Sequence, residues 1–509
     1  MTDSKITHYD AILVSPPSRM INHYRPPVGL LYVGGYLQKK GLKVKIIDVP
    51  MTSVVRNKKF YQNIDQELKK IEHQMIEEFK SVKTKAVGIA FFTPEYFEVF
   101  DLARAYKKID PEVKIFVGGI HPTLYPEEIF EERNCPIDYA IIGEGELTCY
   151  ELVKAINENR DNYKDIAGIA YLDKKTGRFV KINSRPLCEN LDDIAYPAYN
   201  LINMGYYTNA SPYSVRGCLL RSMYIQATRG CPSQCTFCVA KKLSTFTGGG
   251  KSTRVRSAKS LIREIEDLKN NYKIDSFYFI DDLFTINKDN VIDFCNEIRK
   301  RKISVLWGCS SKVTTLNEIV IKHMAEAGCI QIDFGVERGS DKALKLMKKG
   351  ISIKNIKNAF SLCRKYKIRT FANYLVNVPD ETEEDLKDII TLMDELNSEI
   401  VSLNIFTPYP GTEIYTNAPY KFKKEEYPML THATNLIYTQ PEKLLYAKHN
   451  INLLEWTNKY MREYNKIWNN LKIYLRPKYW KMIYYSKNKI NYLKQSVILI
   501  KEFINLKIS

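Results

Sequence analysis

Three cysteines lie close together near the middle of the chain, at Cys231, Cys235 and Cys238. With three and then two residues between them, their thiolates can surround one face of a metal centre from a single short loop. A zinc site usually takes a fourth ligand from a second pair of cysteines or a spaced pair of histidines, and neither follows in this sequence. Three thiolates on a [4Fe–4S] cluster leave one iron without a protein ligand. We therefore expect an iron–sulfur cluster whose open iron can bind a substrate or a cofactor.

The elements that carry this loop alternate between strand and helix. From about residue 222, apolar runs typical of buried strands are separated by stretches with apolar residues at helical spacing, such as Leu261, Ile265 and Leu268. Six such β/α units predict a partial barrel, two units short of the full eight, with its chemistry at the carboxyl ends of the strands. The cysteine loop follows the first of these strands directly. The expected strands are 223–228, 277–281, 304–308, 331–335, 370–376 and 400–406.

An earlier alternation of strands and helices occupies the first part of the chain. It predicts a parallel, doubly wound (Rossmann-like) α/β sheet, whose ligands lie beyond the carboxyl ends of the strands. The loops that leave these strand ends, at 16–17, 92–94, 118–121 and 143–146, are rich in Gly and Pro. Glycine in particular lets the backbone approach a ligand closely. The expected strands are 11–14, 43–47, 86–91, 113–117 and 139–142, with helices at about 29–40, 65–80 and 96–109.

Length and composition agree with a folded protein of several domains. The 509 residues are 45% hydrophobic and 26% charged, which excludes a disordered or low-complexity chain. No run approaches the roughly 18 apolar residues of a membrane-spanning helix, and the apolar run near the N-terminus is too short for a signal peptide. We therefore expect a cytoplasmic location. The net charge is +18, and residues 441–509 hold 14 basic and 4 acidic residues, a net of +10.

The cysteine motif, with Phe237 before its last cysteine, resembles that of the radical S-adenosylmethionine superfamily. The resemblance implies that the three cysteines hold a [4Fe–4S] cluster whose open iron chelates S-adenosylmethionine, which one electron cleaves to a 5′-deoxyadenosyl radical. Segments at the ends of later strands also match the family, but in one of them two family glycines are replaced by Asn377 and Asp380. The residues that the resemblance places at S-adenosylmethionine are Phe237, Asp281, Glu337, Asn377 and Pro379.

The first part of the chain resembles the cobalamin-binding domain of the same class of enzymes, in the segments 16–17, 27–32, 118–123 and 143–146. Cobalamin methyl carriers use a D-x-H-x-x-G motif whose His ligates cobalt, and that motif is absent, since His121 is followed by Pro and Thr. The resemblance implies a cobalamin without a lower His ligand, with His121 in contact with the loop or the cofactor tail. The residues implied to bind cobalamin are Thr93, Gly118, Gly119, His121, Thr123, Gly143 and Glu144.

The two resemblances cover residues 10–415 and imply a cobalamin-dependent radical S-adenosylmethionine enzyme of class B. The implied reaction methylates an unactivated carbon through the adenosyl radical and methylcobalamin; the catalytic residues of the protein are unknown. An alternative is a cobalamin-dependent radical cyclase or rearrangement enzyme acting on a tetrapyrrole or lipid. An RNA methylthiotransferase is less favoured, because it needs three further cluster cysteines near the N-terminus, where only Cys135 and Cys149 occur. The implied partners are a small-molecule or lipid-like substrate and a ferredoxin or flavodoxin as electron donor, without nucleic acid.

We expect four parts: a cobalamin-binding domain at 1–165, a connector with a hairpin at 166–215, the partial barrel at 216–425 and a basic, aromatic helical region at 426–509. The last region mixes Lys and Tyr with three of the four Trp, at positions 456, 468 and 480. Three interpretations stay open for it: a cap on the barrel, a peripheral membrane surface, or a site for single-stranded nucleic acid. For a membrane surface, removal of the last 39 residues (471–509) should leave the barrel and its cluster intact.

Overall fold

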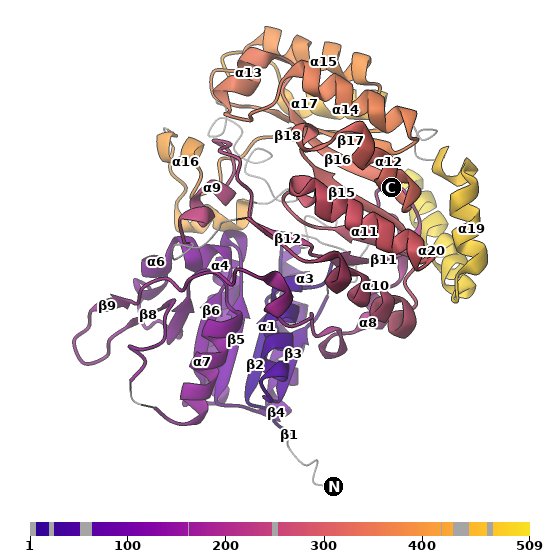
Figure 1. Cartoon of the computed structure of the whole chain (residues 1–509). Helices are drawn as coiled ribbons and strands as arrows, with labels where there is room; N and C mark the ends of the chain where they lie inside the picture. The colour runs from indigo at the N-terminus through magenta and orange to yellow at the C-terminus, as the bar shows by residue number, and fades with distance from the viewer. Residues whose placement is uncertain are drawn as a thin grey trace. The chain divides into compact units, whose positions relative to one another are not determined.

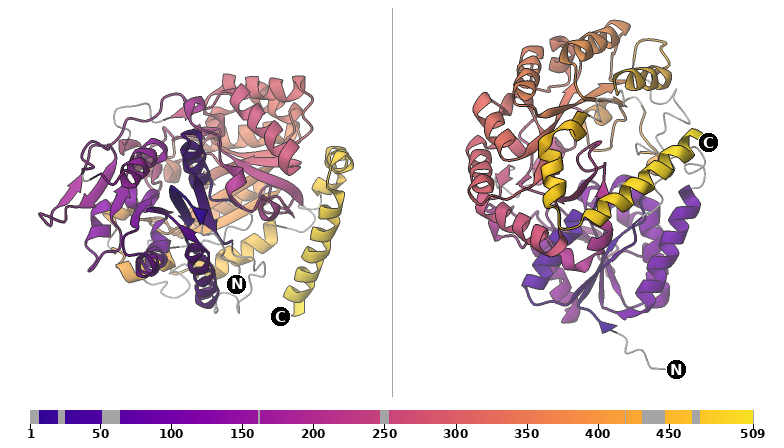
Figure 2. Two further views of the ribbon diagram at one scale, coloured as in Figure 1. Left: turned by 90° about the horizontal axis from the view of Figure 1, so that it is seen from below. Right: turned by 90° about the vertical axis from the view of Figure 1, so that its right-hand side faces the viewer.

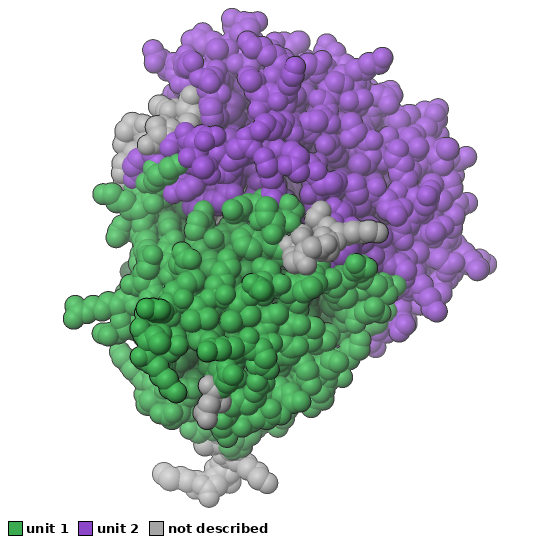
Figure 3. Space-filling model, turned by 60° about the vertical axis from the view of Figure 1, so that its left-hand side comes forward, with its two compact units in different colours: residues 1–204, 242–251, 421–435 green, residues 205–241, 252–420, 436–509 purple. Residues whose placement is uncertain are grey.

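The computed structural model describes residues 7–19, 25–50, 64–160, 162–246, 253–418, 420–430, 447–465 and 472–508. The chain folds into two compact units, which Figure 3 shows in two colours. The first unit draws on residues 1–204, 242–251 and 421–435. The second draws on residues 205–241, 252–420 and 436–509. Each unit is built around one seven-stranded sheet.

The sheet of the first unit has the strand order β3-β2-β5-β6-β7-β8-β9 (Figure 1). The first five strands in this order run parallel, and the hairpin β8–β9 continues the sheet in antiparallel fashion. The order reverses between β2 and β5, and ligands of doubly wound sheets bind at such a switch point. The predicted parallel sheet is confirmed. The strands are β2 (Ala11–Ser15), β3 (Val44–Asp48), β5 (Ala86–Ala90), β6 (Lys114–Gly118), β7 (Tyr139–Ile141), β8 (Ile169–Leu172) and β9 (Phe179–Lys181).

Helices cover this sheet in two pairs, α1 with α7 and α3 with α4. In α3 the residues Leu68, Ile71 and Met75 are buried at helical spacing, so the amphipathic pattern explains why this segment is a helix. Helix α1 ends before Gly41, whose φ of +83° continues the chain in the left-handed region. The helices are α1 (Val28–Lys39), α3 (Ile64–Lys80), α4 (Tyr96–Ile109) and α7 (Glu146–Asn157), with two short helices, α5 (Ile120–Leu124) and α6 (Pro126–Phe130).

The second unit contains the predicted partial barrel. Its six parallel strands pair in chain order, and the short strand β10 (Ala210–Ser211) adds an antiparallel edge. All six predicted strands are present, and their bounds differ from the prediction by a few residues at some ends. The strands are β11 (Leu220–Ile225), β14 (Ser276–Phe279), β15 (Leu306–Ser311), β16 (Cys329–Glu337), β17 (Arg369–Val376) and β18 (Ile400–Ile405).

The helices that follow these strands begin at polar capping residues. Ser257, Asn287, Asn317, Ser340, Ser352 and Thr382 each accept a hydrogen bond from a backbone N–H in the first turn of the next helix. This capping explains why each helix starts where it does. The helices are α10 (Ala258–Tyr272), α11 (Lys288–Lys300), α12 (Glu318–Glu326), α13 (Asp341–Leu346), α14 (Ile353–Lys365) and α15 (Glu383–Leu396).

The C-terminal region packs against the end of the barrel where its strands begin. Tyr479 donates a hydrogen bond to the Leu219 carbonyl at 3.0 Å, and the Asp275 carboxylate accepts from Ser486 at 2.7 Å and from Tyr492 at 3.1 Å. These contacts are those of a cap and favour that interpretation; the effect of removing residues 471–509 stays a prediction. Trp468 lies outside the described residues. The region contains α17 (Leu453–Tyr464), the short helix η10 (Lys472–Leu475), α19 (Pro477–Tyr485) and α20 (Lys489–Ile508).

The same region also covers the open edge of the barrel sheet. The Asn465 side chain accepts from the Val401 N–H at 2.9 Å and donates to the Val401 carbonyl at 2.8 Å, on the edge strand β18. The side-chain amide of Asn465 thus occupies the N–H and the carbonyl of Val401, which an additional strand would otherwise pair with. This pairing protects the sheet edge from association with another strand. In the part of the chain that the structure describes, no helix has the length and apolar character needed to cross a membrane.

Candidate active site

The cysteine loop leaves the barrel at the carboxyl end of β11, after the short strand β12 (Thr228–Arg229). Cys235 is buried, whereas Cys231 and Cys238 are half-buried. The backbone between them is fixed, since Thr236 donates its N–H to the Met347 carbonyl at 3.1 Å and accepts from the Ile414 N–H at 3.1 Å. The loop is therefore anchored to segments that follow the fourth and sixth barrel strands.

Phe237 anchors the same loop through its ring. It packs against a buried apolar group formed by Met347, Val378 and Phe406. The Lys349 ammonium lies 5.5 Å from the centre of the ring. The residue that the sequence placed at S-adenosylmethionine thus also holds the cluster loop on the barrel.

The chemistry of the three thiols fits a cluster more closely than a single ion. Burial raises the pKa of Cys235, and it raises that of Cys238 to about 11; a bound iron would oppose this effect, because it favours the thiolate. Within the described ranges, no three His, Cys, Asp or Glu side chains come together as a site for one metal ion. In a [4Fe–4S] cluster each thiolate binds a different iron, so the three sulfurs surround a larger group and need not converge on one point.

Asp281 lies at the end of β14 and braces the start of the cysteine loop. Its Oδ1 accepts from the backbone N–H groups of Ala227 and Thr228, at 2.8 and 2.7 Å. Burial raises the pKa of Asp281 to about 7, although the two hydrogen bonds act in the opposite direction. The structure therefore places this predicted cofactor residue directly behind the loop, in a supporting position.

Glu337 ends β16 next to the cysteine loop. Its backbone is left-handed, with φ of +65°, at a point where the register with β17 shifts. Its carboxylate forms an ion pair with Lys349 at 2.6 Å. Burial alone would lower the pKa of Lys349, but the nearby Glu337 carboxylate raises it, and the net effect is an increase. This positive charge lies beside Cys235 and Cys238 and favours their ionised form.

The two replaced glycines keep the backbone conformation of glycine. Asn377 has φ of +67° and Asp380 has φ of +62°. Asn and Asp are the residue types besides glycine that adopt this region most readily. Asn377 is fully buried, and its side chain donates to the Phe406 carbonyl at 3.1 Å. The exposed Pro379 lies between the two, so the loop has the form that the glycines would give it.

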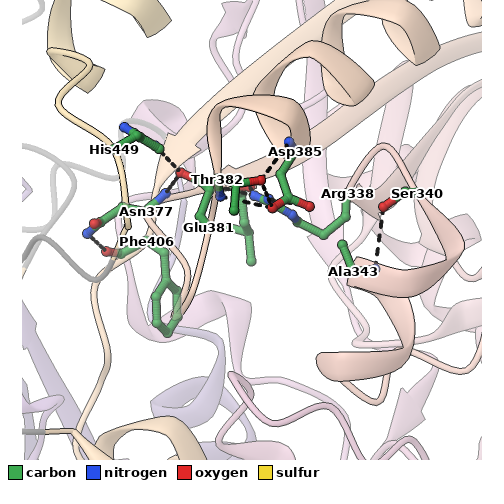
Figure 4. A network of polar contacts seen from close by, with 10 residues as sticks. Arg338, Ser340, Ala343, Asn377, Glu381, Thr382, Asp385, Phe406 and His449 are labelled. Atoms are coloured by element: carbon green, nitrogen blue, oxygen red, sulfur yellow. Dashed lines mark hydrogen bonds and ion pairs between the residues drawn. The ribbon is translucent and has the colours of Figure 1, made fainter.

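A buried polar network holds the loop 377–380 in place (Figure 4). The Glu381 carboxylate accepts from Arg338, from the Asn377 N–H at 2.9 Å and from His449 Nε2 at 3.1 Å. Arg338 also donates to the Leu375 carbonyl at 2.8 Å. The network joins the residues that follow Glu337 and Asn377, so it fixes two strand ends relative to each other.

Sequence reasoning missed Arg338, Lys349 and His449. Arg338 directly follows Glu337, and its place in the matched segment was the available signal. Lys349 and His449 belong to no motif, because their partners are 12 and 68 residues away in the chain. Only the folded structure brings these charges together.

In the first unit, a buried carboxyl lies at the predicted switch point. Glu95, in the loop after β5, accepts from the Ser18 hydroxyl in the loop after β2 and from the Phe92 N–H at 2.9 Å. Burial raises the pKa of Glu95 to about 7. Glu95 was not among the predicted site residues, although it directly follows the predicted loop 92–94.

His121 is enclosed near the same edge of the sheet. Its Nδ1 lies 3.1 Å from the Thr93 hydroxyl, and the rings of Phe91, Tyr96 and Tyr427 surround it at 5.2 to 5.8 Å between centres. Burial lowers the pKa of His121 to about 3, so the imidazole is neutral. Among the described residues its Nε2 has no hydrogen-bond partner.

The two glycine-rich loops of this edge are tied together by Thr123. Its hydroxyl donates to the Gly119 carbonyl at 2.7 Å and accepts from the Gly143 N–H at 3.1 Å. Gly119 has φ of +107°, and a Cβ there would lie 2.7 Å from the Phe91 carbonyl oxygen, so only glycine fits. The structure thus brings together most of the predicted cobalamin residues; Gly118 and Glu144 are half-buried beside them.

Comparison with known proteins agrees with both sites. Residues 225–393 match the model of the radical SAM superfamily, and residues 20–153 match that of the B12 binding domain. An uncharacterized methyltransferase of Pyrococcus horikoshii is 32% identical over 413 residues, which cover 80% of this chain and 82% of that protein. The chain therefore belongs to the family of cobalamin-binding radical S-adenosylmethionine proteins.

Two further similar proteins, a cyclase and a methyltransferase, show that this family includes more than one reaction. The anaerobic magnesium-protoporphyrin IX monomethyl ester cyclase of Rubrivivax gelatinosus is 27% identical over 394 residues, 77% of this chain and 66% of that protein. The radical S-adenosylmethionine methyltransferase TsrM from Kitasatospora setae has the same fold, with a TM-score of 0.62 and 18% identity over 80% of this chain and 76% of that one. The protein is an enzyme that uses a [4Fe–4S] cluster, S-adenosylmethionine and cobalamin.

Proposed function

We propose that the enzyme methylates an unactivated carbon of a small organic substrate. The observation that carries the proposal is the union, in one chain, of a three-cysteine partial barrel and a B12-type sheet, together with 32% identity to a methyltransferase. When bound, the cluster and S-adenosylmethionine supply an organic radical and cobalamin supplies a methyl group. The chain's own residues hold and orient these groups and keep water away.

The barrel residues would act at the carboxyl ends of the strands. We assign the cluster to Cys231, Cys235 and Cys238, in the segment 216–425. Lys349 supports this assignment, because its charge lies beside Cys235 and favours the thiolate. We assign S-adenosylmethionine to the edge formed by Phe237, Asp281, Glu337, Asn377 and Pro379; the left-handed backbone at Glu337 and Asn377 supports a close approach of the main chain there.

The first unit would hold cobalamin at the switch point of its sheet, within residues 1–165. We assign the contacts to Thr93, Gly118, Gly119, His121, Thr123, Gly143 and Glu144. His121 would position the loop and would not ligate cobalt, because Thr93 engages its Nδ1 and aromatic rings enclose it. Two features support a bound group at this edge: Nε2 has no hydrogen-bond partner among the residues that the structure describes, and only glycine fits at position 119.

A radical cyclase is the second candidate, and the 27% identity to the Rubrivivax gelatinosus cyclase favours it. Both reactions need the same cluster and a low-potential electron donor, for which we propose a ferredoxin or a flavodoxin. Product analysis separates them. The enzyme is incubated without oxygen with reductant, cobalamin, cell extract and S-adenosylmethionine that carries a deuterated methyl group. Methylation predicts a product with the deuterated methyl, whereas cyclisation predicts an unlabelled product that has lost two hydrogens.

We also propose that this cytoplasmic enzyme associates peripherally with membranes through residues 441–509. The support for this is the net charge of +10 in that region and the exposed aromatic and aliphatic side chains on its helices. Vesicle sedimentation of the full-length protein, with and without an anionic phospholipid, tests the association.

A further inference from the structure

We infer that α19, α20 and the hollow beside α19 bind the phosphate headgroup of an anionic phospholipid at a bilayer surface. The inference rests on the membrane association proposed above and names its surface and its ligand. Figure 2 shows the two helices in yellow. They cover the end of the barrel where its strands begin, and their other side is free of the barrel.

The outer side of the two helices is unusually apolar for a surface. The buried residues Tyr479, Met482 and Tyr492 face the barrel, as their hydrogen bonds and burial show. Other large side chains in the segment 475–493 are more than half exposed. They are Leu475, Trp480, Tyr484, Tyr485, Ile490 and Leu493. Tyr and Trp beside aliphatic residues match the interface between lipid headgroups and acyl chains.

The charges on these helices are almost all positive, with Glu502 near the end of α20 as the one acidic residue. From residue 464 to residue 501 the sequence has nine Lys or Arg and no Asp or Glu. Lys478, Lys481, Lys487, Lys489 and Lys494 are exposed. This pattern complements an anionic membrane, and it opposes a symmetric dimer through the same face, because like charges would meet. The aliphatic side chains have no partner in a complex with single-stranded RNA, which uses aromatic stacking.

A hollow of about 490 Å³ lies between α19 and the ends of α11 and α12. Four of its lining residues are basic, namely Arg299, Lys302, Lys478 and Lys481, and one, Glu326, is acidic. Glu326 pairs with Arg299 at 2.8 Å. Lys302 and Lys481 are exposed and have no acidic partner in the described ranges, so their charges are available to a phosphate.

The position of the hollow has a consequence for the substrate. The cysteine loop, Glu337 and Asn377 lie at the carboxyl ends of the barrel strands, whereas the hollow lies where the strands begin. A lipid held in the hollow is therefore at the opposite end of the barrel from the cluster. The inferred lipid is an anchor and not the substrate.

Vesicle sedimentation of the full-length enzyme tests the inference. Binding is measured to phosphatidylcholine vesicles with and without phosphatidylglycerol, for the wild type and for the double variant Lys302→Gln/Lys481→Gln. The matched control is Lys288→Gln/Lys354→Gln, which removes the same charge from exposed helix positions at the other end of the barrel. We expect the first pair to weaken binding about 30-fold, which is about 2 kcal/mol, the attraction of two lysines to an anionic surface. The control pair should change it less than about 3-fold.

Each other outcome has a definite meaning. A wild type that binds neither vesicle at low salt removes the membrane association and the inference together. Binding that both pairs weaken equally leaves the association standing and overturns the hollow as its site. Competition by inorganic phosphate, without an effect of Leu493→Ser, would assign the hollow to a soluble phosphate and overturn the lipid. Tighter binding to a single-stranded RNA than to the anionic vesicles would overturn it as well.

Discussion

His449 Nε2 lies 3.1 Å from the Glu381 carboxylate, and both side chains are fully buried. His449 accepts the Ile451 N–H at Nδ1, so Nε2 carries the proton and donates to Glu381. This bond joins a segment that follows the barrel to the loop at the end of its fifth strand. The carboxylate also holds Arg338, so one side chain connects three separate segments below the proposed S-adenosylmethionine edge.

Glu381→Gln should destabilise the protein far more than His449→Gln. The first variant removes the buried counter-charge of the Arg338 guanidinium and leaves it only the partly exposed Asp385 carboxylate at 3.8 Å; breaking such a buried pair typically costs about 3–5 kcal/mol. The second keeps a donor near Glu381 and should cost about 1 kcal/mol. The free energy of unfolding by urea measures both. Equal losses would show that the Arg338–Glu381 ion pair does not dominate the network.

Asp281 should make stability depend on pH. Its folded pKa is raised from 3.8 to about 7, so its contribution to stability is fully present below about pH 4 and is lost as pH rises through about 7. The whole change is at most about 4 kcal/mol. Asp281→Asn keeps an oxygen acceptor and should remove this dependence in urea unfolding between about pH 4 and 8. An unchanged slope in the variant would contradict the assignment.

Asp281→Ala tests whether Asp281 braces the cysteine loop. It leaves the N–H groups of Ala227 and Thr228 buried without an acceptor, at about 1–3 kcal/mol each. The start of the cysteine loop should loosen, so the iron content after anaerobic reconstitution should fall, whereas Asp281→Asn should retain it. Full iron content in the Ala variant would mean that the loop does not depend on this brace.

His121 should not ligate cobalt. Its imidazole is neutral and enclosed, and Thr93 engages Nδ1. The electron-spin resonance spectrum of cobalt(II) in the reconstituted wild type should lack nitrogen splitting from imidazole, and His121→Gln should leave the spectrum unchanged. Nitrogen splitting that disappears in the variant would establish ligation through Nε2 and overturn the positioning role.

Adjacent residues of α20 should differ sharply in their effect on stability. Tyr492 is buried and bonded to Asp275, so Tyr492→Ala should cost about 3 kcal/mol or more. Leu493 is exposed, so Leu493→Ala should change the free energy of unfolding by less than about 0.5 kcal/mol. Urea unfolding of the two variants checks this. A tail that is not part of the barrel's fold would give two equally small effects.

Much of the fold was predictable from the sequence because hydrophobic periodicity is local. The strands and helices of both units, the three cysteines and the glycine-rich loops all follow from residues near one another in the chain. Charge pairs across long separations do not, which is why Lys349 and His449 were missed. The replaced glycines illustrate a third case: Asn377 and Asp380 leave the identity of the turn ambiguous in sequence, and only their positive φ angles show that its shape is kept.

The C-terminal region shows why composition alone was insufficient there. Its basic and aromatic residues left three interpretations open, with the cap ahead of the membrane surface and of single-stranded nucleic acid, because Tyr and Lys occur in all three. The structure divides them by face, with Tyr479 and Tyr492 against the barrel and Trp480 and Leu493 outward. Burial on one side of a helix depends on tertiary packing, which the sequence pattern of a mixed segment does not determine.

Cleavage of S-adenosylmethionine by cysteine variants tests the central claim most directly. Anaerobically reconstituted wild type, Cys231→Ala, Cys235→Ala, Cys238→Ala and the control Cys188→Ala are compared for iron content and for 5′-deoxyadenosine formed with a strong reductant. We predict about four irons per chain and cleavage in the wild type and the control, and neither in the three variants. Any of the three variants that still held about four irons and cleaved S-adenosylmethionine as the wild type does would contradict the account.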